Sequence, residues 1–295
     1  MLLRWGIRGC GKISSDFAFA MEVLPAGEHK IVALCTTDAK RGAKFAADHK
    51  MANDAKVYTS PDEFHADENV DVVYVGTLHP RHKAASIEAL KAGKAVLCEK
   101  PMAMNVADTN EMIETARQKK QFFMEAFWSR TFPVYSELRK HLAQNSIGAV
   151  RAVAADFAQT HLPDSCTLHV TGVDNTASIV LKFRGDRIAN LFYSMDCVSP
   201  SKATASGTIG YIEKLEVFEK APHSFGLTRT VVFTAELPHS KSRFFFENSV
   251  GLSYEAAHVR DCIMKGLTES PVMPHRHSQI IADVMEAACQ QINNQ

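Results

Sequence analysis

The first half of the chain alternates short apolar runs with longer segments of mixed polarity. The apolar runs show no polar alternation, as in VDVVYVG at 70–76, which is typical of strands buried on both faces of a sheet. The segments between them place apolar residues at helical spacing, as Met112, Ile113 and Ala116 do. The predicted strands are 2–7, 31–35, 70–76, 94–100 and 122–128, and the predicted helices are 38–49, 82–93 and 105–120. This alternation predicts a parallel sheet with helices on both faces.

The second half has a different pattern, in which apolar runs follow one another with short turns between them. SGTIG at 206–210 has the composition of a hairpin corner. Two segments with helical spacing end the chain, from Ser253 to Gly266 and from about Ser278 to Ile292. The predicted strands are 150–160, 175–183, 187–197, 202–219 and 230–237. Strands joined by turns predict an open antiparallel sheet, so that residues 131–295 form an α+β domain.

The first turn after a predicted strand carries a glycine pattern, GCGKIS at 9–14. In a dinucleotide-binding fold the first glycine permits a tight turn and the second lets a pyrophosphate approach the backbone. A small third residue then lets helix and strand pack closely. We therefore assign Gly9, Gly11 and Ile13 to cofactor binding, and residues 1–130 to a Rossmann-type, doubly wound α/β domain. The alternative is an ordinary glycine-rich turn.

The end of the second predicted strand selects between NAD and NADP. An acidic residue there would bind the ribose hydroxyls of NAD, but this chain has Thr36 and Thr37, followed by Asp38. Asp38 is expected to cap the following helix. The threonines leave room for a 2′-phosphate, and Lys40 and Arg41 follow closely. The sequence therefore favours NADP, with NAD as the alternative, and places Thr37 in the cofactor site.

Polar clusters follow three later strands of the predicted parallel sheet, at 77–82 (TLHPRH), 98–101 (CEKP) and 125–130 (EAFWSR). In open α/β sheets ligands bind beyond the carboxyl ends of the strands, so these clusters are expected to face one crevice. A lysine beside such a crevice can stabilise a developing alkoxide, and partial burial would lower its pKa. We predict that the cofactor contacts Thr77, His79, Glu99, Lys100, Trp128 and Arg130.

Composition narrows the classes of partner. The chain has 295 residues, 46% of them hydrophobic and 22% charged, and a formal net charge of zero. A neutral chain has no electrostatic footprint for nucleic acid or for an anionic membrane, so a small polar molecule is the expected ligand. The seven cysteines are scattered and form no C-x-x-C pair, which favours reduced thiols in the cytoplasm. No stretch has the length of a membrane span, and the N-terminal apolar stretch is too short for a signal peptide.

Four motifs in this order, G-x-G-x-x-S, T-x-H-P-x-H, C-E-K-P and E-A-x-W-x-R, resemble the glucose–fructose oxidoreductase / inositol dehydrogenase family. The resemblance implies a nicotinamide-dependent oxidoreductase that acts on the CH–OH group of a sugar or a diol. It implies that Lys100 is catalytic, because the lysine of E-K-P lies beside the reacting carbon, and that Pro101 follows a cis peptide bond. It also implies a homodimer formed through the second sheet. Family members often have arginine where this chain has Thr37.

One segment departs from the family pattern, between about 158 and 174. In the family, a loop and a long helix with a G-G-x-L-x-D-x-G-x-[HY] signature lie there, and the final His or Tyr is the acid–base residue. This chain has THLPDSCTLHVTG instead. His161, Asp164, Cys166 and His169 do not have the spacing of a zinc site. Three hypotheses stay open: a histidine replaces the missing group, the chain binds cofactor without catalysis, or it is a truncated splice or gene-model form.

Overall fold

The computed structural model describes most of the chain, which divides into two compact units. Unit 1 comprises Met1–Phe132 and Glu236–Gln295, and unit 2 comprises Pro133–Ala235. The residues that the structure describes are 2–51, 53–158, 176–194, 202–208, 210–213, 216–220, 227–233 and 235–293.

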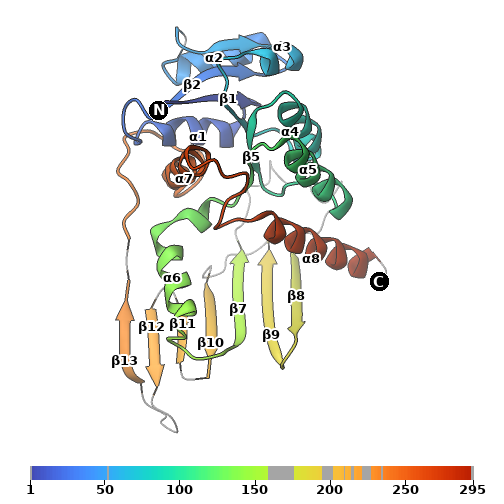
Figure 1. Cartoon of the computed structure of the whole chain (residues 1–295). Coiled ribbons are helices and arrows are strands. Elements are labelled where there is room, and N and C mark those ends of the chain that lie inside the picture. The colour runs from blue at the N-terminus through green and yellow to red at the C-terminus, as the bar shows by residue number, and fades with distance from the viewer. Residues whose placement is uncertain are drawn as a thin grey trace. The chain divides into compact units, whose positions relative to one another are not determined.

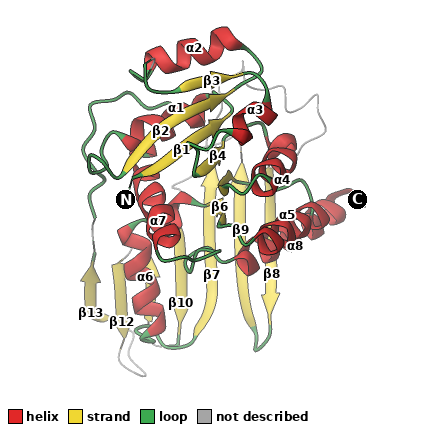
Figure 2. Cartoon of the chain, turned by 45° about the horizontal axis from the view of Figure 1, so that its top comes forward, coloured by secondary structure: helices red, strands yellow, loops and turns green. Residues whose placement is uncertain are grey.

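Unit 1 is built on a six-stranded sheet with the strand order β3-β2-β1-β4-β5-β6, and every neighbouring pair is parallel (Figures 1 and 2). This is the doubly wound order: β1, β2 and β3 follow one another towards one edge of the sheet, and β4, β5 and β6 follow one another towards the other edge. The strands are β1 (Leu3–Arg8), β2 (His29–Cys35), β3 (Lys56–Tyr58), β4 (Val72–Val75), β5 (Ala95–Glu99) and β6 (Phe123–Ala126). The Rossmann-type fold predicted from the sequence is therefore confirmed, whereas the short strand β3 was not predicted.

Helices cover both faces of this sheet because alternate residues of each strand point to opposite faces. Trp5 and Tyr74 pack with α1, α2 and α7, and Phe17 of α1 stacks on the Tyr74 ring at 4.0 Å. Val73 and Val96 pack on the other face with α3, α4 and α5. The helices are α1 (Lys12–Met21), α2 (Ala39–Asp48), α3 (Pro61–Ala66), α4 (His82–Lys91) and α5 (Val106–Lys119).

The C-terminal segment of the chain belongs to unit 1. Helix α7 (Leu252–Met264) packs against α1, and helix α8 (His275–Asn293) packs against α5. Buried apolar residues of α7, among them Leu252, Ala256 and Val259, complete the core on the α1 face of the sheet. The expected division into 1–130 and 131–295 differs from the structure in this respect, because the apolar faces of both helices find their partners on the first sheet.

Unit 2 is built on a seven-stranded sheet with the order β13-β12-β11-β10-β7-β9-β8. Its pairs are antiparallel except for β7 and β9, which are parallel, so the sheet is mixed rather than purely antiparallel. The strands are β7 (Val150–Ala158), β8 (Thr176–Phe183), β9 (Arg187–Ser194), β10 (Ala203–Gly207), β11 (Gly210–Glu213), β12 (Glu216–Lys220) and β13 (Leu227–Val232). The predicted corner at 206–210 is confirmed, since β10 ends at Gly207 and β11 begins at Gly210.

Helix α6 (Pro133–Ala143) opens unit 2 and was not predicted. Its Leu138 and Leu142 pack with Ile147, Val150 and Ala205 in a small apolar cluster, which holds the helix against the sheet. No helix within the described ranges is long and apolar enough to cross a membrane.

Candidate active site

The tight turn between β1 and α1 requires glycine at its first position. Gly9 has a φ of +97°, and its N–H donates to the carbonyl oxygen of Cys35 at the end of β2, 2.8 Å away. A Cβ at Gly9 would lie 3.0 Å from the carbonyl oxygen of Gly76, which follows β4. Any side chain would therefore be strained by φ and would also meet backbone. The turn brings the ends of β1, β2 and β4 together.

The N-terminus of α1 is free to receive an anion. Helices α2, α3 and α5 are capped by the side chains of Asp38, Ser60 and Asn105, but α1 begins after Gly11 with no side-chain cap and no acidic residue in its first turn. A Cβ at Gly11 would meet nothing closer than the Gly76 oxygen at 4.0 Å. Open space beside uncapped N–H groups fits a pyrophosphate. Ile13, half-buried, packs its side chain on the core of unit 1 instead.

The end of β2 has the arrangement expected from the sequence. Asp38 caps α2, because its Oδ1 accepts the N–H groups of Lys40 at 2.8 Å and Arg41 at 3.4 Å. The cap uses one of the two carboxylate oxygens of Asp38. Thr36 is buried, whereas Thr37 and Asp38 are exposed. A contact of Thr37 with a bound ribose stays a prediction.

The turn after β4 is fastened to the turn after β5 by two histidines. His79 Nε2 lies 2.8 Å from the carbonyl oxygen of Ala103. The buried His82 lies between two carbonyl oxygens, with Nδ1 2.8 Å from Pro101 and Nε2 3.0 Å from Thr77. Burial lowers the pKa of His82, although both carbonyls oppose this effect. His82 belongs to the T-x-H-P-x-H motif, but sequence reasoning did not assign it a role.

Thr77 lies in the turn after β4 with its hydroxyl turned into the protein. Its Oγ1 is buried and has no hydrogen-bond partner among the described groups. A buried hydroxyl without a partner is uncommon and indicates a polar group that would complete it. A cofactor ribose or amide bound in the crevice would supply such a group.

The end of β5 carries a buried carboxylate directly before the predicted catalytic lysine. Glu99 is 6% exposed, and Tyr74 donates its hydroxyl to Oε1 over 2.6 Å. The N–H of Lys100 donates to Oε2 over 3.3 Å. Burial raises the pKa of Glu99, and Tyr74 and Lys100 act in the opposite direction. Both oxygens of Glu99 therefore have protein partners, and its contact with the cofactor stays a prediction.

Lys100 itself is exposed, and its peptide bond to Pro101 is cis. The side chain nevertheless starts from a fixed point, since Glu99 before it is buried and the carbonyl of Pro101 after it lies against His82. This arrangement suits a cation that meets substrate at the mouth of a crevice.

Trp128 and Arg130 lie on a short helical turn, Trp128–Thr131, after β6. Trp128 is half-buried and packs on the core of unit 1, with its ring 5.9 Å from that of Phe132. Arg130 Nη1 donates to the carbonyl oxygen of Val272 over 2.9 Å and lies 2.7 Å from His277 Nδ1. These contacts tie the turn to α8 and to the segment that precedes it. A further contact of either residue with cofactor stays a prediction.

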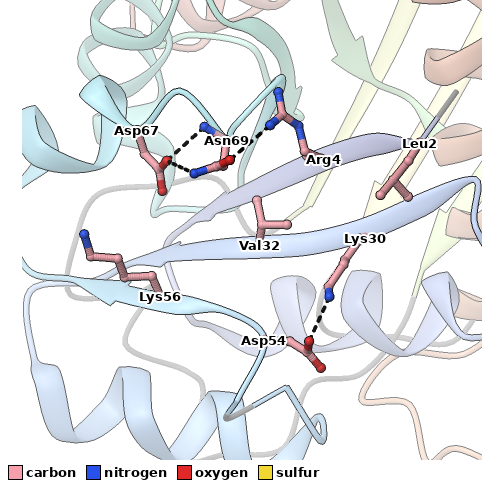
Figure 3. A pocket seen from close by; sticks show the side chains of 8 residues that line it. All are labelled: Leu2, Arg4, Lys30, Val32, Asp54, Lys56, Asp67 and Asn69. Carbon is pink, nitrogen blue, oxygen red and sulfur yellow. Dashed lines mark hydrogen bonds and ion pairs between the residues drawn. The ribbon is translucent and has the colours of Figure 1, made fainter.

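A shallow pocket of about 340 Å³ lies at the opposite end of the sheet (Figure 3). Its charged side chains are engaged with one another or with neighbours: Lys30 pairs with Asp54, and Arg4 bonds to Asn69 and Asp71. Because it lies at the starts of the strands, where parallel sheets do not bind cofactors, it is not a candidate for the cofactor site. It is lined by Leu2, Arg4, Lys30, Val32, Asp54, Lys56, Asp67 and Asn69.

A metal centre finds no support in the described part of the chain, where no group of three or more His, Cys, Asp or Glu side chains is arranged to hold an ion. The four residues whose spacing was compared with that of a zinc site lie outside the described residues: His161, Asp164, Cys166 and His169.

Known proteins resemble this chain over most of its length. Residues 3–127 match the oxidoreductase family with an NAD-binding Rossmann fold, GFO/IDH/MocA. The chain is 36% identical to trans-1,2-dihydrobenzene-1,2-diol dehydrogenase of Xenopus tropicalis, over 99% of this chain and 98% of that protein. It is 38% identical to the Macaca fascicularis protein of the same name, over 97% and 96% of the two chains.

Solved structures show the same fold at low sequence identity. An oxidoreductase from Agrobacterium radiobacter in complex with NAD⁺, L-tartaric acid and magnesium superposes with a TM-score of 0.81 at 17% identity, over 100% of this chain and 97% of that one. Levoglucosan dehydrogenase, in complex with NADH and levoglucosan, gives a TM-score of 0.80 at 16% identity, over 98% of each chain.

The alignment with the Xenopus tropicalis relative also measures a difference in length. It runs over 335 positions, whereas this chain has 295 residues, so at least 40 aligned positions have no counterpart here. The alignment nevertheless covers 99% of this chain and 98% of the relative. The chain belongs to the GFO/IDH/MocA oxidoreductase family and is, by its resemblance to named relatives, a dehydrogenase with an NAD(P)-binding Rossmann fold.

Proposed function

We propose that the chain is an NADP-dependent oxidoreductase that oxidises the CH–OH group of a trans-dihydrodiol or of a sugar such as D-xylose. The observation that carries the proposal is made at the carboxyl ends of β1, β4 and β5. An uncapped helix N-terminus at Gly11 follows β1 and an exposed lysine, Lys100, follows β5, and His82 fastens the turn after β4 to the turn that carries Lys100. The names of the relatives supply the diol as substrate class.

The roles divide between the turns of unit 1. Gly9 and Gly11 would admit the pyrophosphate, Thr37 the adenosine ribose and Thr77 a polar group of the bound cofactor. The nicotinamide ring supplies a hydride acceptor when it is bound. Lys100 would bind the substrate hydroxyl and stabilise the negative charge that develops on its oxygen, while the hydroxyl proton would pass to solvent water.

NADP is preferred over NAD in this proposal because the side chain that most often selects NAD is absent from the ribose position. Asp38 is used as a helix cap, and the exposed residue is Thr37. Lys40 and Arg41 are exposed in the first turn of α2, where a cation can meet a 2′-phosphate.

A second candidate is a cofactor-binding homologue without catalysis, and the missing alignment positions favour it. We place the missing positions between about 158 and 174, where the family's acid–base residue is expected. Unless a group outside the described residues replaces that residue, the cofactor would bind and turnover would not follow.

The test combines cofactor binding and turnover in one series. NADPH fluorescence is measured on mixing, and then oxidation of trans-dihydrobenzenediol and of D-xylose is followed with NADP⁺. The enzyme proposal expects binding and turnover, with turnover abolished in Lys100→Met and retained in Lys91→Met, a matched exposed lysine. Binding without turnover of either substrate would favour the second candidate, and no binding at all would contradict both.

We propose a homodimer and a cytoplasmic location, in line with the family resemblance. Val180 and Ile188 are 61% and 47% exposed and lie on the same face of the β8–β9 pair in unit 2, where an interface would cover them. The five cysteines within the described residues are all free thiols. Light scattering after size exclusion would test the dimer, and a mass near that of a single 32.6 kDa chain would contradict it.

A further inference from the structure

A buried glutamate of β6 bonds to the turn that carries Lys100. Glu125 is 2% exposed, and its Oε1 accepts the backbone N–H of Met102 over 2.8 Å. Its Oε2 is also buried and has no hydrogen-bond partner among the described groups. The other three residues of β6 are apolar, and burial of a carboxyl group costs free energy that an apolar residue at this position would not cost. The bond to Met102 therefore accounts for an acid at a position that the cofactor site and the proposed reaction do not use.

The backbone N–H of Met102 requires a partner from outside its own segment. Strand β5 ends at Glu99 and α5 begins at Val106, so residues 100–105 lie outside regular secondary structure. Met102 is 2% exposed, which shields its N–H from water. A buried backbone N–H without an acceptor is costly, and Oε1 of Glu125 supplies that acceptor. An uncharged carboxyl group would serve as well as a carboxylate, because both have an oxygen that accepts.

Side chains bond to four consecutive residues of this turn, each through a backbone group. The bonds, in chain order, are Lys100 N–H to Glu99 Oε2 (3.3 Å), Pro101 O to His82 Nδ1 (2.8 Å), Met102 N–H to Glu125 Oε1 (2.8 Å) and Ala103 O to His79 Nε2 (2.8 Å). The two histidines follow β4, which is one neighbour of β5 in the sheet, and Glu125 belongs to β6, which is the other. Of these four side chains, Glu125 is the one that holds the turn from the β6 side.

The position of this backbone matters because the Lys100 side chain is long and exposed, so that the turn is its fixed point. An error of about 1 Å in the placement of a reacting group can lower a rate by about a hundredfold. We propose that Glu125 is a positioning residue for Lys100: by accepting the Met102 N–H from the β6 side, it fixes the turn from which the Lys100 ammonium group reaches substrate. The catalytic part of this role rests on the proposed function of Lys100.

The first experiment measures hydrogen exchange at single amides of the turn, by mass spectrometry with electron-transfer fragmentation. Glu125→Leu fills the same place without an acceptor. Exchange should become about fivefold faster at Met102 and also at Lys100, whose N–H bonds to Glu99 and not to Glu125. Glu125→Gln keeps an acceptor oxygen and should restore the parental rates. Parental exchange at Lys100 in the leucine variant would overturn the proposal, because Glu125 would then hold its own bonding partner and not the turn.

Two further variants complete this experiment. Asp16→Asn alters a buried carboxyl group of α1 that accepts the backbone N–H groups of Phe245 and Phe246, so it separates a general loss of stability from an effect on the turn. Exchange at Lys100 should stay parental in this control, and an increase equal to that in the leucine variant would overturn the proposal. Glu125→Asp, whose shorter side chain withdraws the oxygen from Met102, should behave as the leucine variant does and replaces it if leucine prevents folding.

The second experiment measures the consequence for catalysis, with NADP⁺ and trans-dihydrobenzenediol. Glu125→Leu should lower kcat by about tenfold or more and leave NADPH affinity within about twofold of the parent, and Glu125→Gln should recover most of kcat. An unchanged kcat, or a loss of NADPH affinity with kcat retained, would overturn the positioning role. An absence of turnover in the parent would contradict the proposed function alone, because the exchange experiment measures the hold on the turn without substrate. The two proposals therefore fail separately.

Discussion

Single positions in the turns of unit 1 make up the proposed cofactor site, and Gly9 allows the clearest test. Gly9 and Gly93 both have a positive φ, at +97° and +80°, but a Cβ at Gly93 would meet nothing within 4 Å. Gly93→Ala should therefore cost about 1 kcal/mol of strain in the free energy of unfolding. Gly9→Ala should cost more, because its Cβ also meets backbone, and should weaken NADPH binding. Urea unfolding and fluorescence titration measure both effects, and equal NADPH affinity in the two variants would contradict the assignment of the turn.

Cofactor choice is also argued at a single residue. Thr37→Asp places a carboxylate at the exposed position after β2, where it can accept the ribose hydroxyls of NAD and repel a 2′-phosphate. The ratio of NADPH to NADH affinity should fall by about tenfold or more, which corresponds to about 1.4 kcal/mol. Thr37→Ser is the matched control and should leave the ratio unchanged. An unchanged ratio in the aspartate variant would remove Thr37 from the cofactor site.

Among the elements, α1 connects the cofactor turn to the C-terminal part of unit 1. Asp16 of α1 is fully buried, and its two oxygens accept the N–H groups of Phe245 and Phe246, at 2.7 and 2.9 Å. These bonds hold the segment that leads into α7. The same carboxylate thus orders a stretch of chain without regular structure and keeps α7 in register with α1.

Asp16→Asn tests this connection. The amide has one acceptor oxygen in place of two, so one N–H loses its partner and the remaining bond is no longer charge-assisted. We expect the free energy of unfolding to fall by about 1.5–3 kcal/mol and cleavage by protease between Lys241 and Arg243 to become faster. Asp48→Asn, at an exposed i,i+4 pair with Lys44, should change stability by about 0.5 kcal/mol or less. If the two variants are equally stable, Asp16 does not hold the segment.

The sequence predicted those parts of unit 1 in which local pattern and tertiary contacts agree. The strands 70–76 and 94–100 are continuous apolar runs and occur as predicted, within a few residues, as β4 and β5. Strand β3 has three residues, too few to show a pattern, and the side of α6 that packs on the sheet carries only two half-buried leucines, Leu138 and Leu142. Lys100 and the turns around it were predicted from motifs. The burial of Glu255 was not predicted, because a glutamate on a helix resembles a solvated residue until the tertiary structure buries it.

At the scale of the whole molecule, the pH range of stability reflects buried groups that titrate in opposite directions. Burial lowers the pKa of His29 and of His65 from 6.5 to about 4, and neighbouring arginines add to the effect. Burial raises the pKa values of Glu99 and Glu255, so these two groups lower the free energy of unfolding as pH increases. The histidines cost stability as pH falls. The folded state of unit 1 should therefore be most stable between these two limits.

The acid limit can be predicted from the histidines. Above pH 6.5 both rings are neutral in the folded and unfolded chains and affect stability little. Between pH 6.5 and about pH 4 the histidines are protonated in the unfolded chain but stay neutral in the folded chain. The free energy of unfolding therefore falls as pH decreases, by roughly 1 kcal/mol per histidine per pH unit after allowance for solvent screening. His29→Gln keeps an acceptor for Trp5 Nε1 while removing this loss, as His65→Gln does at its site. Urea unfolding of the double variant should show a shallower dependence on pH over this range than the parent. Parallel curves would contradict the prediction, because they would mean that both rings bind protons over the same pH range in the folded and unfolded chains.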